Sequence, residues 1–450
     1  MSNGDGVSGE DRPAHANETP SRLIRPSRIV KEGAWVAIGQ AVAAVAGLAG
    51  TRLLTTLLPP AVYGQISLLI GLGALGAGIA CMPFLQATLR SFSEARDAGK
   101  IGALRGLLGH YLRRGVAAVA ALFAVVGTSW AVWGTTRVSL ALFAAAAVSV
   151  AFDAWRTYES AFLNAARRQR DLAVRTSLDA IARPAVAAAL VLWFGASALP
   201  VVLGFAAGSA IVGTFLRRRI VTGDGGGAWR DDAWVISHRT DFLRYATPLI
   251  PMSALSWIMS MGDRYILAGT WGAEVVGVYW AAYALGSQSF IAANVLITTT
   301  LRPVLYDAVA RGDSRKERRT LRVWIVVVTA VASAGWLLTT VFAIPLCRLL
   351  LGPAYGAAAD LIPWIAAAYA LQMIQQTFEV ILYADGRSNR LVVLQASAAT
   401  LAVAFYLVLI PRYGALGAAM GTLGTFIVTT VIAFVLSGAA RKIFGREPLI

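Results

Sequence analysis

Long apolar runs recur along the whole chain, and polar residues gather in the short segments between them. A helix needs about 20 predominantly apolar residues to cross the hydrocarbon core of a bilayer. Twelve runs reach this length, near residues 33–57, 64–88, 115–134, 138–163, 176–195, 199–216, 245–269, 275–300, 323–344, 358–383, 391–410 and 415–438. The pattern therefore predicts an all-α integral membrane protein with 12 transmembrane helices.

The composition agrees with this pattern. Apolar residues (AVILMFWYC) make up 57% of the chain and charged residues 14%, about half of the roughly 25% charged residues in a soluble domain. So few charges cannot cover a soluble surface, which excludes a soluble enzyme and a disordered scaffold. Two cysteines, Cys81 and Cys347, are too few for a disulfide framework, and we expect both to be unpaired.

The basic residues indicate the orientation of the chain. A net charge of +16 would suggest a nucleic-acid partner in a soluble protein, but in a membrane protein Lys and Arg mark the cytoplasmic loops. Alternate connections are basic, such as the one that contains Arg217–Arg219. The basic residues of the opposite connections are Arg137, Arg348 and Arg412. We therefore expect no nucleic-acid partner and a multi-pass protein with both termini cytoplasmic.

Two polar segments divide the chain. Residues 1–30 are rich in Gly, Pro and Ser and lack the features of a signal peptide, so we expect a disordered cytoplasmic tail. Residues 217–244 form the longest connection and are expected to be a cytoplasmic linker. The linker separates an N-terminal six-helix bundle, residues 31–216, from a C-terminal six-helix bundle, residues 245–450.

The two halves repeat each other. Thr88-Leu89-Arg90 and Thr300-Leu301-Arg302 lie 212 residues apart, as do Arg52 and Arg264. Each of these last two arginines precedes a short turn that ends on a glycine. The two glycines are Gly64 and Gly277. Each half has an even number of predicted spans, so the repeat is parallel, and two such bundles would enclose a central cavity.

Several segments carry a family resemblance. Residues 33–90, with GAWVAIGQ, TRLLTTLLPPAVYGQ and ATLRSF, resemble the start of the polysaccharide flippases of the MOP (MATE-like) superfamily. So do MGDRYILAGTWGAEVVGVYWAAYAL, LLLGPAYGAAADLIPWIAAAYAL and LIPRYGALGAAMGT in the second half. The resemblance covers nearly the whole chain after residue 30.

The resemblance implies a function. A protein of this family would move an anionic polyprenyl-pyrophosphate-linked oligosaccharide across the bacterial cytoplasmic membrane by alternating access, from the inner to the outer leaflet, for synthesis of a cell-surface polysaccharide. Its candidate partners would be membrane lipids, a polysaccharide polymerase and export proteins. No cofactor is implied.

Charged residues inside predicted spans are the first site candidates, because they are costly in lipid and usually face a cavity or a partner. Arg52, Asp263 and Arg264 lie toward the outer ends of the first and seventh spans. Guanidinium groups bind phosphate bidentately and stay protonated, so Arg52 and Arg264 could hold a pyrophosphate. The alternative is that each arginine reaches the outer interface or pairs with a carboxylate.

Two polar stripes are the second candidates. Asp153, Arg156 and Glu159 share a stripe in the fourth span. Its counterpart in the tenth span consists of Gln372, Gln375 or Gln376, and Glu379. Such groups could bind sugar hydroxyls or couple transport to protons, or they could form a polar seam between helices. Asp179 and Arg183 are expected to be a structural i, i+4 pair.

Arg90 and Arg302 are the third candidates, at the cytoplasmic ends of the second and eighth spans. They could recruit an anionic lipid head group from the inner leaflet or serve to anchor the topology.

Motifs for catalysis or metal binding are missing from the sequence. There is no phosphate-binding G-x-x-x-x-G-K-[ST] loop, and His15, His110 and His238 have no metal-ligand spacing to other residues. We therefore expect neither an enzyme nor a metal site. Two alternatives stay open: a MATE-like drug or cation exporter, which should have an acidic cavity, and a polysaccharide polymerase, which should have a large outer loop.

Overall fold

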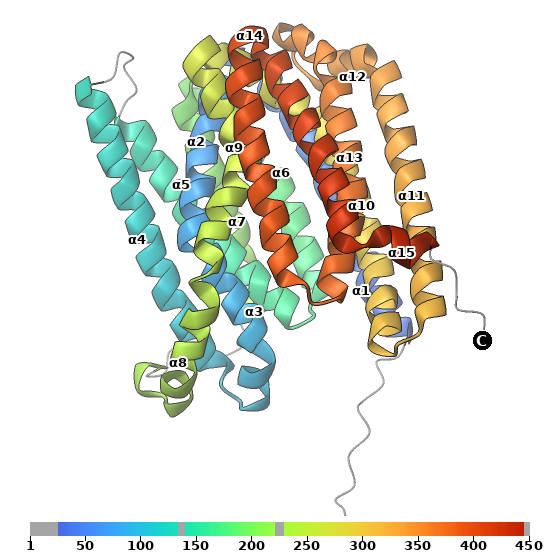
Figure 1. Ribbon diagram of the computed structural model, residues 1–450. Helices are drawn as coiled ribbons and strands as arrows, with labels where there is room; N and C mark the ends of the chain where they lie inside the picture. Colours follow the sequence, from blue (N-terminus) through green and yellow to red (C-terminus); the bar gives the residue numbers. More distant parts are fainter. Residues whose placement is uncertain (1–25, 134–139, 221–228, 445–450) are drawn as a thin grey trace, which may run out of the picture.

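Every regular element is a helix in the residues that the computed structural model describes, which are 26–133, 140–220 and 229–444 (Figure 1). The α-helices are α1 (Pro26–Leu57), α2 (Pro60–Ala80), α3 (Met82–Asp97), α4 (Ile101–Trp133), α5 (Leu140–Ala165), α6 (Gln169–Phe194), α7 (Ala198–Ile220), α8 (Ala233–Ala246), α9 (Leu249–Trp271), α10 (Ala273–Ala310), α11 (Ser314–Val341), α12 (Ala343–Leu350), α13 (Ile362–Ala384), α14 (Ser388–Ser437) and α15 (Ala439–Phe444). Two short 3-10 helices are η1 (Trp229–Asp231) and η2 (Pro353–Asp360).

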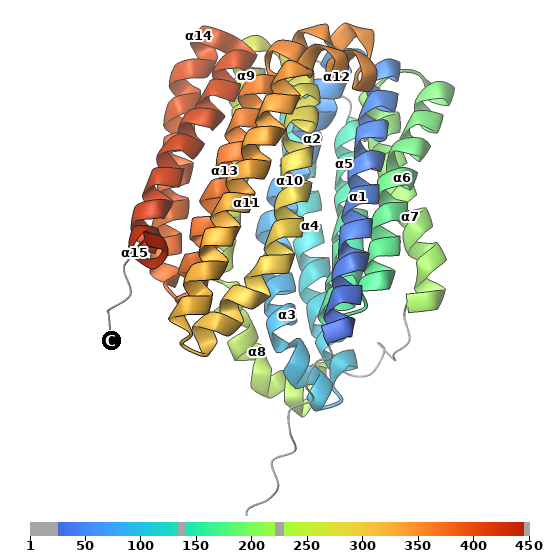
Figure 2. The same ribbon diagram turned by 90° about the vertical axis from the view of Figure 1, so that its right-hand side faces the viewer.

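The helices are long and apolar enough to cross a membrane many times. Within the described ranges, nine helices meet that test, or ten if η2 and α13, which are bent by 55° at Leu361, count as one broken span. The chain is therefore a multi-pass integral membrane protein. Figure 2 shows that the long helices run roughly side by side, as expected for spans of one bilayer.

Helix α14 contains a reversal of direction. Gly414 has φ 57° and ψ −132°, a conformation that favours glycine. Arg390 near the start of the element donates from Nη1 to the carbonyl of Leu436 near its end, at 2.6 Å. The hydroxyls of Tyr406 and Thr422 are 3.2 Å apart. The two segments on either side of Gly414 therefore lie antiparallel, as the two red helices of Figure 1 show.

Prolines explain two of the helix boundaries. Pro59 is extended and Pro60 begins α2, the position where the missing N–H of proline costs nothing. The predicted span 64–88 is divided at Cys81, because Pro83 in the first turn of α3 cannot continue the hydrogen bonding of a preceding helix.

Other boundaries differ from the prediction. Helix α1 begins at Pro26, inside the predicted tail, whose residues 1–25 lie outside the described ranges. The predicted linker, 217–244, contains the end of α7, the 3-10 helix η1 and most of α8. Its glycines at 225–227 are not among the described residues. The sequence analysis missed these helical turns because their side chains are polar or charged. A search for apolar runs detects only the part of a helix that lies in lipid.

Helix α8 packs against the first half of the chain although it leads into the second. Its Phe242 and Ala246 are buried in a cluster with Phe92 and Leu108 of α3 and α4. The Nζ of Lys100 donates to Asp232 Oδ2 at 3.0 Å. The Nε of Arg239 on α8 donates to the hydroxyl of Tyr111 at 3.2 Å.

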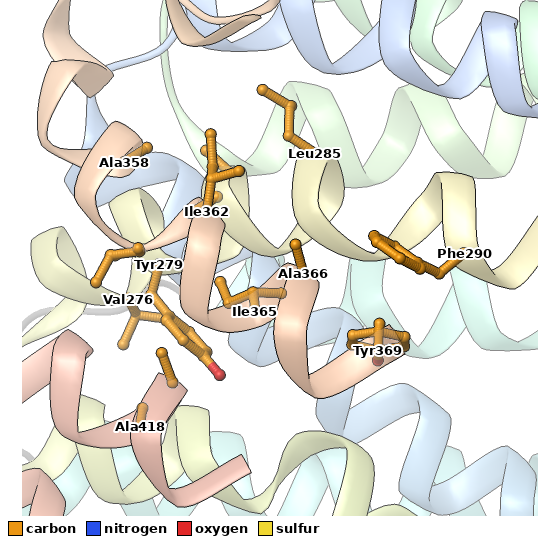
Figure 3. Close-up of a cluster of buried hydrophobic side chains, with 14 of the residues drawn as sticks. Val276, Tyr279, Leu285, Phe290, Ala358, Ile362, Ile365, Ala366, Tyr369 and Ala418 are labelled. Atoms are coloured by element: carbon orange, nitrogen blue, oxygen red, sulfur yellow. The ribbon is translucent and has the colours of Figure 1, made fainter. Parts of the chain in front are cut away.

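The largest apolar cluster extends through the second half and into the first. Figure 3 shows part of it, where Ile362 and Ile365 of α13 face Tyr279 and Leu285 of α10. A Cβ on Gly286 would lie 2.8 Å from the side chain of Ile365, so this glycine lets α10 and α13 approach closely.

The two halves meet where α1 turns into α2 and α9 turns into α10. We call this the distal end of the bundle and the opposite end, which carries α8, the proximal end. The repeat-related glycines Gly64 and Gly277 contact each other there. A Cβ on Gly64 would lie 1.8 Å from the carbonyl oxygen of Ala273, and one on Gly277 would lie 1.9 Å from that of Pro60. The absence of both side chains is what allows α2 and α10 to touch.

Two hydrogen bonds join the halves at the same end, between α1 and the segment of η2. The backbone N–H of Gly352 donates to Thr55 Oγ1 at 3.0 Å, and the hydroxyl of Tyr355 donates to the carbonyl of Leu58, also at 3.0 Å. η2, which carries Tyr355, thus caps the end of α1.

Candidate functional site

Asp263 and Arg264 of α9 are buried at the contact between the halves, with 2% and 3% of their surface exposed. Consecutive residues of a helix point in directions about 100° apart. Asp263 therefore faces Tyr279 of α10, and Arg264 faces Ser67 of α2. The two charged side chains are held by different neighbours.

Arg264 has few partners for its five N–H donors. Its Nη1 lies 3.3 Å from Ser67 Oγ and 3.1 Å from Met261 Sδ. Its guanidinium carbon lies 4.8 Å from the centre of the Tyr283 ring, a cation–π contact. The Nε atom is buried without a hydrogen-bond partner. Arg264 thus keeps unused donor capacity at the contact between the halves.

The carboxylate of Asp263 accepts its hydrogen bonds from groups other than the guanidinium of Arg264. It accepts a hydrogen bond of 2.6 Å from the hydroxyl of Tyr279 and one of 2.8 Å from the backbone N–H of Arg264. Neither Asp263 nor Arg264 belongs to any of the ion pairs among the described residues. The buried positive charge has a carboxylate in its surroundings but none in direct contact.

Aromatic side chains surround this pair, and the sequence analysis did not single them out. Tyr63 of α2 stacks on Trp280 of α10 with ring centres 4.3 Å apart. Tyr283 of α10 and Tyr369 of α13 are joined through their hydroxyls. Tyr279 and Tyr283 are four residues apart, a spacing that places both on one face of α10. This spacing, within the segment MGDRYILAGTWGAEVVGVYWAAYAL that carries the family resemblance, is the signal that could have revealed them.

Arg52, the repeat counterpart of Arg264, is in a different environment. It is half-buried, and its Nη1 donates to the carbonyl of Arg348 on α12 at 3.3 Å. Arg52 and Arg264 share no hydrogen-bond partner among the described residues.

The stripe of α5 is part of a charge network with α6. Asp153 pairs with Arg156 at 3.2 Å and with Arg183 at 3.3 Å. The predicted pair of Asp179 with Arg183 is wrong, because Arg183 reaches across to α5 and the nearest cation to Asp179 is Arg175, at 3.9 Å.

Arg175 was missed by the sequence analysis, which assigned it to a cytoplasmic connection. Its Nε and Nη2 are buried without hydrogen-bond partners. Asp153, Arg156 and Arg183 line a cavity of about 200 Å³ whose other walls come mainly from apolar side chains of α2, α3 and α7. The first half therefore contains a small cavity in which charges of both signs are set among apolar neighbours, and we call it the polar cavity after those charges.

Glu159 is separated from the other members of its stripe. Six residues along a helix correspond to about 600°, so Glu159 points about 120° away from Asp153. It is buried and lines a different cavity of about 620 Å³, together with Lys100, Arg105 and Arg168.

The stripe of α13 joins three helices of the second half. Gln375 Nε2 donates to Glu379 Oε1 at 2.9 Å, and Thr429 of α14 donates to Gln375 Oε1 at 2.7 Å. Asn294 of α10 donates to the side-chain oxygen of Gln376. These hydrogen bonds are of the kind that a polar seam between helices would make.

Arg90 and Arg302 are both exposed. The guanidinium of Arg90 lies 4.6 Å from the centre of the Tyr245 ring at the end of α8, which fixes Arg90 against the linker helix. Arg302 has no such contact among the described residues, so the repeat relates the two positions but not their surroundings.

Cysteines and histidines form no metal site within the described ranges, where no group of three His, Cys, Asp or Glu residues could hold an ion. Cys81 and Cys347 are free and buried. Cys347 belongs to α12. His15 lies outside the described residues.

Solved structures share the fold. The inward closed conformation of the lipid II flippase MurJ aligns with a TM-score of 0.69 and 13% identity, over 89% of this chain and 86% of that one. An outward-facing multidrug resistance MATE family transporter of the MOP superfamily gives 0.64 and 14%, over 92% and 94%. A MOP superfamily transporter from Pyrococcus furiosus, described as having a binding pocket of reversed polarity, gives 0.64 and 15%, over 92% and 94%. The fold is therefore that of MATE and MurJ transporters.

The family is shown by a sequence match over more than half of the chain. Residues 29–309 match the family of polysaccharide biosynthesis proteins. No curated protein matches the chain. The chain thus belongs to the polysaccharide biosynthesis protein family and has the fold of a MOP-superfamily transporter.

Proposed function

We propose that this protein is a flippase that moves a polyprenyl-pyrophosphate-linked oligosaccharide from the cytoplasmic to the outer leaflet by alternating access. The observation that carries the proposal is Arg264, a buried guanidinium with unused donors at the contact between the halves. A buried charge is costly unless it is paired or functional. A pyrophosphate would supply the paired oxygens that a guanidinium binds best.

The proposal includes twelve spans and an orientation. The two antiparallel segments of α14 would each cross the membrane, and α9, with its 23 residues, is long enough to do so as well. The proximal end would face the cytoplasm of a bacterial cell, because basic residues such as Arg113 and Arg114, in the part of α4 nearest that end, gather there. Both termini would then be cytoplasmic, and the six-helix bundles 31–216 and 245–450 would rock so that the Gly64–Gly277 contact opens and closes with the distal end.

Other residues take roles in this scheme. Arg90 and Arg302 would attract the anionic head group at the cytoplasmic side, and Arg52 would receive it once the distal end opens. The polar cavity of Asp153 and Arg156 would bind sugar hydroxyls. We assign Asp263 the role of fixing Tyr279 beside Arg264. Glu159, Gln376 and Glu379 are further candidates for contact with the glycan. None of these roles requires enzyme chemistry.

The test is the fate of lipid-linked glycans in a deletion strain that carries plasmid-borne variants. We expect Arg264→Ala to lower flipping by at least about tenfold, and Arg264→Lys to restore it incompletely, because an ammonium cannot bind a phosphate bidentately. Units protected from a glycosidase added outside spheroplasts measure the block. Arg319→Ala is a matched control, since Arg319 is exposed on α11. Flipping at the wild-type rate in Arg264→Ala would refute the assigned role.

A cation exporter is the second candidate, because multidrug MATE transporters share the fold over 92% of this chain. Asp263 would then be the group that binds the cation. In that case the deletion strain would accumulate no lipid-linked glycans, and Asp263→Asn would abolish drug efflux. A polymerase would instead leave single glycan units exposed outside the cell.

A further inference from the structure

A basic pocket lies at the proximal end, away from Arg264 and from the polar cavity of α5. Its volume is about 600 Å³, and α4, η1 and α8 form its walls. α4 contributes Leu107, His110, Tyr111 and Arg114, which share one face of the helix at i, i+3, i+4 and i+7. η1 and α8 contribute Trp229, Arg230, Val235, Ile236, Arg239, Thr240 and Leu243.

The walls of this pocket are fixed by close packing. A Cβ on Gly106 would lie 2.4 Å from the Trp229 side chain, so this glycine lets the indole lie directly on α4. The imidazole of His110 lies 5.2 Å from the same indole. Arg239 is held by Tyr111, and Phe242, on the neighbouring turn of α8, is buried against the first half. The pocket is therefore part of the folded bundle.

Its charge is of one sign. Arg114, Arg230 and Arg239 line it, and no carboxylate does among the described residues. Asp231 of η1 is exposed and does not line the pocket, and Asp232 is turned away toward Lys100. Arg114 and Arg230 form neither an ion pair nor a hydrogen bond with any described residue. Their guanidinium groups are available to an anion.

Its position is that of a membrane interface. α4 has 33 residues, and about 20 suffice to cross the hydrocarbon core, so its first turns extend beyond the lipid at the proximal end. Apolar side chains stand beside the arginines in the pocket, and Ile236 is 63% exposed. A molecule that matches both the arginines and the apolar side chains of the pocket has a phosphate and an apolar part.

We propose that this pocket binds the phosphate head group of an anionic membrane lipid, with Arg114 and Arg230 on the phosphate and with Ile236 and Leu243 against the start of the acyl chains. Basic pockets beside transmembrane helices are suited to such head groups. A lipid bound here bridges α4 and α8, and so holds the helix that leads into the second half against the first. The site is separate from the transport site proposed above and does not depend on it.

The experiment uses the full-length protein in nanodiscs of phosphatidylcholine with phosphatidylglycerol, followed by native mass spectrometry of the lipid retained after transfer to detergent. The test variant is R114E/R230E. The control is R244E/R319E, which makes the same change in net charge at two exposed arginines outside the pocket. Arg239 is kept because its bond to Tyr111 holds α8 in place.

We expect the wild-type protein and the control to retain phosphatidylglycerol in preference to phosphatidylcholine, and R114E/R230E to lose that preference by about tenfold. We also expect phosphatidylglycerol to raise the melting temperature of the wild type and of the control but not of the test variant. Equal retention in all three proteins would overturn the proposal. So would stabilisation of the wild type by inorganic phosphate as large as that by phosphatidylglycerol, since it would assign the pocket to a free anion.

Discussion

At the scale of single residues, the structure separates charges that the sequence places side by side. Asp263 and Arg264 were expected from the sequence to be significant, because charges are costly in lipid. Their partners were not predictable, since Ser67 lies 197 residues away and Tyr279 belongs to another helix. Arg52 shows the same limit, because its repeat relation to Arg264 predicted a shared site, whereas its hydrogen bond goes to α12.

Asp232 carries a prediction about pH at the same scale. The hydrogen bond from Lys100 lowers the pKa of Asp232 below its usual value, and the backbone N–H of Trp234 adds to this effect. A lowered pKa in the folded state means that the contribution to stability is complete above the unfolded value of about 3.9 and is lost as the pH falls further. We therefore expect α8 to loosen from the first half below about pH 4.

Hydrogen exchange of residues 229–246 measures this change. Asp232→Asn should keep the N-terminal cap of α8, because asparagine caps as well as aspartate. At neutral pH, the protection of these amides relative to their intrinsic exchange rate should be lower than in the wild type. Between about pH 5 and about pH 3 that protection should fall in the wild type but not in the variant. Equal acid sensitivity in the variant would show that other groups hold α8.

At the scale of helices, the sequence predicted the apolar segments well and their polar extensions poorly. α4 begins at Ile101, whereas its apolar run begins near residue 115. The backbone continues its hydrogen bonds into water, where charged residues are tolerated, so no apolar signal marks the true start. α8 was hidden in the predicted linker, although its buried Val235, Phe242 and Ala246 have helical spacing. That spacing could have revealed it.

The contact of α2 with α10 makes a prediction at this scale. In Gly64→Ala the new methyl would lie 1.8 Å from the carbonyl oxygen of Ala273, so the helices must separate. Overpacking of this kind typically costs about 1–3 kcal/mol. We expect the closed distal end to become less populated, seen as a longer distance between spin labels at Thr56 and Pro353.

Gly269→Ala is the matched control for this change. Gly269 is exposed on α9, nothing lies within 4 Å of the position that its Cβ would take, and alanine favours a helix there. The label distance should match that of the wild type in this control. If Gly64→Ala also left the distance unchanged, the close approach of the two glycines would not be what holds the distal end together.

At the scale of the whole molecule, the repeat was visible in the sequence, but the state of the bundle was not. Offsets near 212 residues related the two halves, and the glycines that end the equivalent turns meet in the structure. Nothing in a repeat tells which end is closed, because both states of an alternating transporter use the same sequence and differ by a few kcal/mol. The closure is seen in contacts that join distant segments, such as Tyr355 with Leu58.

This closure leads to the last prediction, which tests alternating access itself. Thr56 of α1 and Pro353 of η2 are both exposed, and they belong to the two halves that meet at the distal end. A Cβ on Gly352 would lie 3.1 Å from the Cα of Thr56 there. We expect Thr56→Cys with Pro353→Cys, in a background with Cys81→Ala and Cys347→Ala, to be joined by a short cleavable bifunctional thiol reagent. Cross-linked protein should stop transport, because the distal end can no longer open, and cleavage of the link should restore it. Each single-cysteine variant treated with the reagent shows whether modification alone has an effect. Transport that continues through an intact cross-link would mean that the substrate crosses without separation of the two halves at this end, and the rocking of two bundles would have to be abandoned as the mechanism.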